Sequence, residues 1–264
     1  MKLHKIGCFQ KFRKLLMFAS KKRYMHNSTI FRKVITTEEK VLELVNKANG
    51  SENNCLITYL NQHCYNIYST DKAYKNLIDN HFNTYIDGIG IYLALRLLGY
   101  NVVKRFNATD LNEKIFRLLA QKSSKAYIIG GNYSNSIINK FKTGGIDVIG
   151  YQNGFFDKKE TKELISNINK TNPDTVIIGM GVPKQEYLAE QITKEISGKL
   201  IICVGNFLEF YLGNIKRIPG MFRNIGLEWI FRMFTEPKRL CKRYIVGIPV
   251  FFFLIMKEYM AGDN

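Results

Sequence analysis

The sequence lacks the features that mark several large classes of protein. Its five cysteines form no Cys-x-x-Cys pair and no Cys/His spacing typical of a metal site, and their odd number argues against a secreted disulfide framework. Its four histidines offer no His-Glu-x-x-His pattern, and no Asp-x-Asp motif is present among its aspartates. We therefore expect a reduced, cytoplasmic protein that requires no metal and no other cofactor.

Long apolar runs are also missing. The longest uncharged apolar stretch runs from Tyr244 to Met256, whereas a membrane-spanning helix needs roughly 20 such residues. The N-terminal region carries basic residues but no apolar core of the length that a signal peptide needs. The sequence therefore predicts no export signal, and an apolar segment that enters one leaflet of a membrane without crossing it.

Acidic residues are scarce, because 22 Asp and Glu stand against 39 Lys and Arg, which gives a formal net charge of +17. Such a surplus favours contact with phosphate-rich ligands, anionic lipid or nucleic acid. No recognised nucleic-acid motif is present, so we expect no nucleic acid among the partners. A basic nucleic-acid-binding protein stays open as the rival from another class; it would bind oligonucleotides in a salt-sensitive way and ignore UDP.

Short apolar runs alternate with helical patterns through the middle of the chain. The runs have the length of strands and lie at Cys55–Tyr59, Phe82–Ile86, Ala126–Ile129, Ile146–Tyr151, Thr175–Met180 and Lys199–Val204. Between them, segments such as 110–122, 158–170 and 184–197 carry an apolar residue at about every third or fourth position. This order predicts an α/β fold with a Rossmann-like parallel sheet and helices on both faces.

The chain divides into three parts by composition. Residues 1–35 are basic and poorly patterned and predict a weakly ordered lead-in, residues 36–213 predict the α/β catalytic core, and residues 214–264 predict a basic, aromatic, helical C-terminal appendage. Within the appendage Arg232, Arg239 and Arg243 fall on one helical stripe if the segment is continuous, although Pro237 indicates two helices. Clustered guanidinium groups suit diphosphate recognition, and a solvated basic face is the alternative.

Ligands of open parallel sheets bind beyond the carboxyl ends of the strands, so residues just after each strand are the candidates for chemistry. Asp87 follows an apolar strand and could accept the proton of an attacking hydroxyl, or it could cap the next helix. Gly179–Glu186 joins a strand to a helix, where free backbone N–H groups suit a phosphate or sugar oxygen. Thr58 and Asn61 could hydrogen-bond a sugar, or serve as turn and capping residues.

Several ordered motifs, spread over residues 58–244, resemble the WecG/TagA/CpsF family of bacterial glycosyltransferases (glycosyltransferase family 26). The resemblance rests above all on Asp87-Gly88-Ile89-Gly90, on the segment Gly150 to Phe156, on Gly179-Met180-Gly181-Val182-Pro183-Lys184-Gln185-Glu186, and on Leu227-Glu228-Trp229. It implies an inverting, metal-independent transfer from a UDP-sugar, of the N-acetylmannosamine type, to a sugar on undecaprenyl diphosphate. Such chemistry serves the synthesis of a cell-surface polysaccharide or a polymer of the teichoic-acid type.

The resemblance also implies roles for residues. Asp87 would be the general base, with Thr58 and Gln185 placing the two substrates, and arginines of the appendage would neutralise the diphosphate of the leaving group. Substrate contacts are expected from residues in these motifs and in the appendage, namely Asn61, Arg105, Asp110, Gly131, Asn153, Gly181, Lys184, Glu186, Glu209, Arg217, Arg232, Arg239, Lys242 and Arg243. The appendage would dock on the anionic inner face of the cell membrane, and a homo-oligomer is possible.

Two departures from the family pattern leave the donor sugar open. Leu208-Glu209 stands where Phe-Asp is common, and Arg217-Ile218-Pro219 stands where Arg-Ala-Pro is common. The same enzyme class with a UDP-glucose or uronic-acid donor is therefore an alternative, and a membrane-associated scaffold that has lost turnover is another.

Overall fold

A six-stranded sheet forms the centre of the protein. The computed structural model describes residues 28–48, 51–133, 135–215, 217, 222 and 228–261, without the side chains of residues 135–138, 158, 228 and 239. The strands lie where the apolar runs predicted them: β1 Cys55–Leu60, β2 Phe82–Ile86, β3 Lys125–Gly130, β4 Asp147–Asn153, β5 Thr175–Ile178 and β6 Leu200–Cys203. Their order is β2-β1-β6-β5-β3-β4, and every neighbouring pair is parallel.

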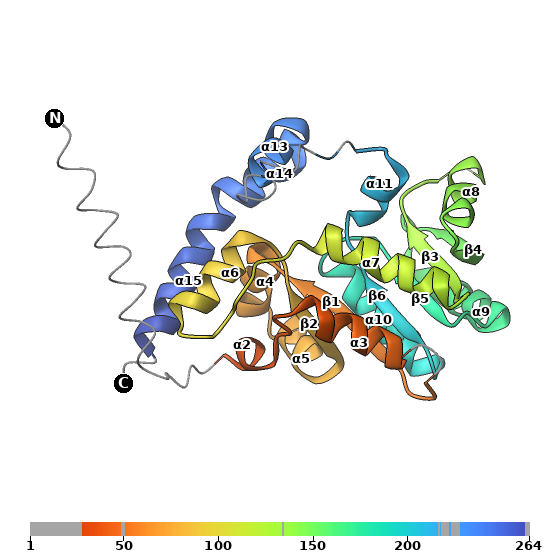
Figure 1. Ribbon diagram of the computed structural model, residues 1–264, viewed down its shortest axis with the longest axis horizontal. Coiled ribbons are helices and arrows are strands. Elements are labelled where there is room, and N and C mark those ends of the chain that lie inside the picture. Colours follow the sequence, from red (N-terminus) through yellow and green to blue (C-terminus); the bar gives the residue numbers. More distant parts are fainter. Residues whose placement is uncertain are drawn as a thin grey trace.

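Helices pack on both faces of this sheet, which confirms the predicted fold class (Figure 1). In the core they are α2 Thr29–Lys33, α3 Glu38–Ala48, α4 Gln62–Thr70, α5 Lys72–His81, α6 Gly88–Leu97, α7 Ala108–Gln121, α8 Asn135–Thr143, η2 Lys158–Glu160, α9 Thr161–Thr171, α10 Lys184–Glu195 and α11 Phe207–Leu212. Side chains of Asn61, Asp71 and Asn107 accept backbone N–H groups in the first turns of α4, α5 and α7, which fixes where these helices begin.

Alternation along the strands divides the core into two clusters. Val176 and Ile178 of β5 pack with apolar residues of α9 and α10, whereas Ile177 between them packs with α3 and α7 on the opposite face. Successive side chains of a strand point to opposite faces, and both faces here are covered, so the strands are apolar throughout. Because every neighbouring pair of strands is parallel, the carboxyl ends of all six strands lie at the same edge of the sheet.

The predicted boundary of the lead-in needs correction. Residues 1–27 lie outside the described part of the chain, but residues 28–35 belong to the core. Ile30 and Phe31 of α2 are buried, and Ile35 forms a parallel bridge with Tyr85 of β2. The sequence of this stretch is short and weakly patterned, so its apolar residues gave no signal of the partners that bury them.

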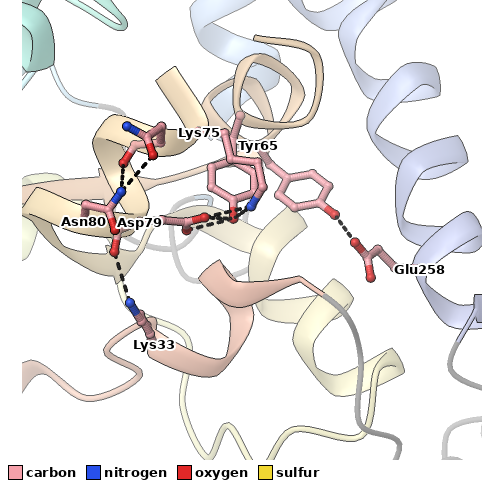
Figure 2. Close-up of polar contacts among 8 residues, drawn as sticks. Lys33, Tyr65, Lys75, Asp79, Asn80 and Glu258 are labelled. Atoms are coloured by element: carbon pink, nitrogen blue, oxygen red, sulfur yellow. Dashed lines mark hydrogen bonds and ion pairs between the residues drawn. The ribbon is translucent and has the colours of Figure 1, made fainter. Parts of the chain in front are cut away.

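The C-terminal part is helical and docks along α4. It contains α13 Glu228–Thr235, α14 Pro237–Ile245 and α15 Gly247–Ala261, so the break predicted at Pro237 is confirmed. Phe251 and Ile255 of α15 are buried, and the Phe251 ring meets Tyr65 of α4 edge to face. The Tyr65 hydroxyl lies 3.5 Å from Glu258 Oε1 (Figure 2). These contacts join the appendage to the core beside the site.

The apolar part of this appendage is longer than the uncharged run in the sequence. Residues Leu240–Ala261 form a stretch of helix that is long and apolar enough to cross a membrane by length and composition. The sequence prediction of a segment too short to cross is revised in that respect, because helical residues on both sides of the uncharged run extend it. One side of α15 is nevertheless packed on α4, as a helix lying against the core would be.

Candidate active site

Two cavities open side by side at the carboxyl edge of the sheet. The first, of about 560 Å³, lies where β1, β2 and β6 end and is closed by α13, α14 and α15; we call it the aspartate cavity because Asp87 lines it. The second, of about 430 Å³, lies where β3, β4, β5 and β6 end and is lined by six glycines; we call it the glycine cavity. Gly181 and Asn206 line both, so two substrates bound here would meet.

The chain reverses direction at the glycine cavity. From β3 the chain moves outward to β4, whereas from β5 it moves the other way to β6, and β3 and β5 are neighbours. Such a switch point leaves a crevice between the two connections, where open parallel sheets bind their ligands. The topology therefore favours the glycine cavity for a nucleotide.

Asp87 is held by contacts from two other elements. Its Oδ1 accepts the backbone N–H of Ala108 at 3.0 Å, at the start of α7, and its Oδ2 accepts the side-chain amide of Asn61 at 3.3 Å. Its side chain makes no capping hydrogen bond to α6, although it stands at the N-cap position. Asp87 therefore does not cap α6 through its side chain. Its carboxylate lines the aspartate cavity instead.

Asn61 is a helix cap and also a partner of Asp87, and its contact with a sugar stays a prediction. Its Oδ1 accepts the backbone N–H groups of His63 and Cys64 at the start of α4, which makes it the helix cap. Its Nδ2 donates to Asp87, and its Oδ1 also lies 3.4 Å from Arg243 Nη2. One asparagine thus ties β1, Asp87 and α14 together.

Cations of the appendage form one wall of the aspartate cavity. Arg232, Lys242 and Arg243, for which the sequence predicted substrate contacts, line it. The Nε atoms of Arg232 and Arg243 are buried and have no hydrogen-bond partner among the described residues. Arg232 also lies over the Phe210 ring and 3.6 Å from Glu236. The side chain of Arg239 lies outside the described part of the chain.

The glycine cavity combines close backbone packing with one carboxylate. A Cβ at Gly131 would lie 2.7 Å from Glu209 Oε1, so a side chain there would require this carboxylate to shift. The Tyr133 hydroxyl donates to Glu209 Oε1 at 2.7 Å, and Asn214 donates to Oε2 at 2.9 Å. Gly181 and Lys184 line the same cavity, and Asn153 forms the turn that leads into Phe155 by accepting the Phe155 N–H.

Three predicted residues lie beneath the cavities and line neither of them. Thr58, Gln185 and Glu186 are buried, and Glu186 Oε1 accepts hydrogen bonds from Thr58 Oγ1 at 2.7 Å and from Gln185 Nε2 at 2.8 Å. Gln185 Oε1 in turn accepts the backbone N–H of Gly205 at 3.0 Å. Burial raises the pKa of the Glu186 carboxyl, and its Oε2 has no partner in the part of the chain described. This network supports the floor of the site.

Three other predicted residues lie at the border of the site. Arg105 lines a smaller cavity on the other side of Asp87, and it does not line the two larger ones. Arg217 pairs with Asp110 at 2.7 Å and with Glu113 at 2.8 Å. Asp110 and Arg217 line neither the aspartate cavity nor the glycine cavity, so in this structure they bind one another.

Four residues that the structure brings to the site are absent from the substrate contacts expected from the sequence, although Tyr59 and Asn206 lie at the ends of predicted strands. Tyr59 and His63 line the aspartate cavity, Asn206 lines both cavities, and Phe155 stands 82% exposed at the glycine cavity. Burial, and then the charge of Arg243, lower the pKa of His63 to about 4, so its imidazole is neutral at physiological pH. Buried Asn206 Nδ2 has no protein partner among described residues. Alternation on β1 turns Tyr59 away from Thr58, and because Thr58 was the predicted site residue, this pattern gave no signal for Tyr59.

A metal site is not evident in the described ranges. Within them, no three His, Cys, Asp or Glu side chains come together in a group that could hold a metal ion. Metal independence stays a prediction.

Comparison with known proteins agrees with this geometry. A model of the glycosyl transferase WecG/TagA/CpsF family matches residues 29–264. This chain is 27% identical to each of two Staphylococcus aureus proteins, from strains MRSA252 and NCTC 8325, over 214 and 216 residues. Both are named N-acetylglucosaminyldiphosphoundecaprenol N-acetyl-beta-D-mannosaminyltransferase. Each alignment covers 80% of this chain and 83% of the relative. The chain therefore belongs to the WecG/TagA/CpsF family of glycosyltransferases.

Proposed function

We propose that this glycosyltransferase moves N-acetylmannosamine from its UDP derivative to N-acetylglucosamine carried on undecaprenyl diphosphate, with inversion at the anomeric carbon. The observation that carries the proposal is the position of Asp87. Its carboxylate lies in a cavity whose opposite wall is cationic and which joins a second cavity at a topological switch point. The printed names of the relatives support the choice of donor sugar and acceptor.

Asp87 is the general base of this proposal. It takes the proton from the acceptor hydroxyl as that oxygen forms its bond to the anomeric carbon, and the bond from that carbon to UDP breaks on the opposite side. The electron pair of the broken bond leaves with the diphosphate. Arg232 and Arg243 lie where they could balance the charge that develops there.

The glycine cavity is the proposed site of the UDP moiety. Its lining offers backbone groups at close range, the Glu209 carboxylate for ribose or base hydrogen bonds, and the exposed Phe155 ring for stacking. Glu209 is longer than the family's usual aspartate, and Tyr133 and Asn214 hold it in place. A UDP-glucose or uronic-acid donor is the alternative that the enzyme assay must separate.

We also propose that the protein acts at the inner surface of the cell membrane. Exposed apolar side chains on α14, on α15 and at the residue between them include Ile245, Val246, Phe252 and Phe253, and the net charge of +17 attracts anionic headgroups. A lipid-linked acceptor makes this placement useful, because the acceptor diphosphate lies at the membrane surface.

The test is transfer by the purified protein. UDP release is followed with a panel of UDP-sugars and a diphosphate-linked N-acetylglucosamine acceptor, for wild type, Asp87→Asn and Asp147→Asn. We expect UDP-N-acetylmannosamine to be preferred and Asp87→Asn to lower kcat by about two to four powers of ten. Asp147, exposed at the amino end of β4, is the matched control and should have no effect. Undiminished turnover by Asp87→Asn would remove the mechanism, and preference for another sugar would remove the donor assignment.

A further inference from the structure

A third cavity, of about 140 Å³, adjoins Asp87 on the side of α6 and α15. Its polar lining includes Asn61, Asp87, Arg105, Asn107, Arg232 and Arg243. Its apolar lining includes Ile89 of α6 and Ile248 of α15. A cavity lined by three arginines and by apolar side chains matches a diphosphate that is esterified to an apolar chain.

The start of α6 comes near the Phe251 side chain of α15 beside this cavity. A Cβ at Gly90 would lie 3.6 Å from Cε1 of Phe251, an ordinary van der Waals distance, so the Phe251 ring lies beside α6 at this glycine. Ile89 precedes Gly90, and Ile248 lies three residues before Phe251. Both isoleucines line the third cavity.

Each helix continues the apolar surface from the cavity to the outside. Residues four positions apart lie on one face of a helix, so Leu93 follows Ile89 on α6 and Phe252 follows Ile248 on α15. Leu93 is 46% exposed and Phe252 is 63% exposed. The two helices lie side by side in Figure 1, in agreement with the Gly90–Phe251 approach. Large apolar side chains thus lead from the arginines beside Asp87 to the protein surface.

We infer that this third cavity binds the diphosphate of the lipid acceptor, and that Leu93 and Phe252 contact the first isoprene units of its chain. The inference rests on the proposed function and deepens it. It separates the two diphosphates of the reaction. UDP lies on the side of the glycine cavity, the acceptor lies on the side of α6, and Arg232 and Arg243 line the cavities on both sides of Asp87. The acceptor sugar then reaches Asp87 while its lipid leaves between α6 and α15.

Chain length of the acceptor provides the test. In detergent solution, where docking on a bilayer plays no part, KM is measured for undecaprenyl-diphosphate-N-acetylglucosamine and for an analogue with a methyl group in place of the polyprenyl chain. The variants are Leu93→Gln and Phe252→Gln. Each should raise KM for the long-chain acceptor about fivefold, because less apolar surface is buried, and leave KM for the methyl analogue and for the UDP-sugar unchanged.

Phe234→Gln is the matched control. Phe234 is 76% exposed on α13 and lines none of the three cavities, so its replacement should change neither KM value. An equal effect of Phe234→Gln would show general contact with detergent and overturn the inference. The inference would also be overturned if Leu93→Gln and Phe252→Gln raised KM equally for both acceptors, or if neither variant changed KM for the long-chain acceptor. A wild-type protein that transfers to neither acceptor would instead overturn the proposed function, and this inference with it.

Discussion

Thr58 Oγ1 donates a hydrogen bond to Glu186 Oε1 across 2.7 Å, and both side chains are sealed from solvent. The bond joins β1 to the first turn of α10, 128 positions later in the chain. Gln185 donates to the same oxygen and accepts the N–H of Gly205, so the turn after β6 belongs to the same hydrogen-bond network. The positions of both cavities depend on this junction, because β1, α10 and the β6 turn all contribute to their walls.

Glu186→Gln should preserve the junction, whereas Glu186→Ala should not. The amide oxygen can still accept from Thr58 and Gln185, but alanine leaves both donors unpaired and a void, at a cost of about 3 kcal/mol in the free energy of unfolding. Burial raises the native pKa of this carboxyl, so the folded state holds a proton that the unfolded state loses as pH rises above the usual carboxyl range. Wild-type stability should therefore fall as pH rises through that window.

Urea unfolding between pH 4 and pH 8 measures this effect, in the range where a raised carboxyl pKa would act. Glu186→Gln should show a weaker pH dependence than wild type and retain turnover. If Glu186→Gln folds normally but has lost turnover, the group acts in catalysis and the positioning role is wrong.

Thr58→Val and Tyr59→Phe should separate the two neighbours on β1. Thr58 faces α10 and Tyr59 lines the aspartate cavity. We expect Thr58→Val to lower stability by about 1–2 kcal/mol, because Glu186 loses a donor, with little change in kcat. Tyr59→Phe should lower kcat/KM by about tenfold and leave the melting temperature nearly unchanged, since it removes a hydroxyl at the cavity. The opposite pattern in paired kinetics and calorimetry would restore the catalytic role that the family resemblance implied for Thr58.

Asn206→Asp should weaken catalysis by removing a donor between the two cavities. The buried Nδ2 of Asn206 finds no partner within the described part of the protein, and a substrate oxygen could supply one. A hydrogen bond to a charged group contributes about 1.5–3 kcal/mol, so kcat/KM should fall by about ten- to a hundredfold. Asn101 is exposed in the loop after α6, so Asn101→Asp makes the same chemical change away from the cavities and serves as the control. Equal kinetics for Asn206→Asp and wild type would show that substrate does not use this amide.

Phe253→Asp should weaken membrane docking without unfolding the protein. Phe253 is exposed on α15, and a charge there cannot enter the interface. Sedimentation with anionic phospholipid vesicles should show about a tenfold loss of binding, and added salt should weaken wild-type binding as well. Ser166→Asp, exposed on α9 at the opposite end of the molecule in Figure 1, adds the same charge and should bind as wild type does. Unaltered vesicle binding by Phe253→Asp would exclude α15 as the docking surface.

Local patterns determined the fold class and the region of the site. The apolar runs that became β1 to β6 and the helical periods between them were readable because alternation and the 3.6-residue repeat are properties of short segments. The position of Asp87 directly after β2, the break at Pro237 and the capping role of Asn61 were readable for the same reason.

Tertiary structure alone decided which side chains meet. Alternation shows that Thr58 and Tyr59 face opposite ways, but only the packing of α10 shows that Tyr59 faces the cavity. Likewise Arg217 became the partner of Asp110, and residues 28–35 became core, through contacts with residues far away in sequence. A segment's own pattern fixes which of its residues share a face; what covers that face depends on how distant segments pack together.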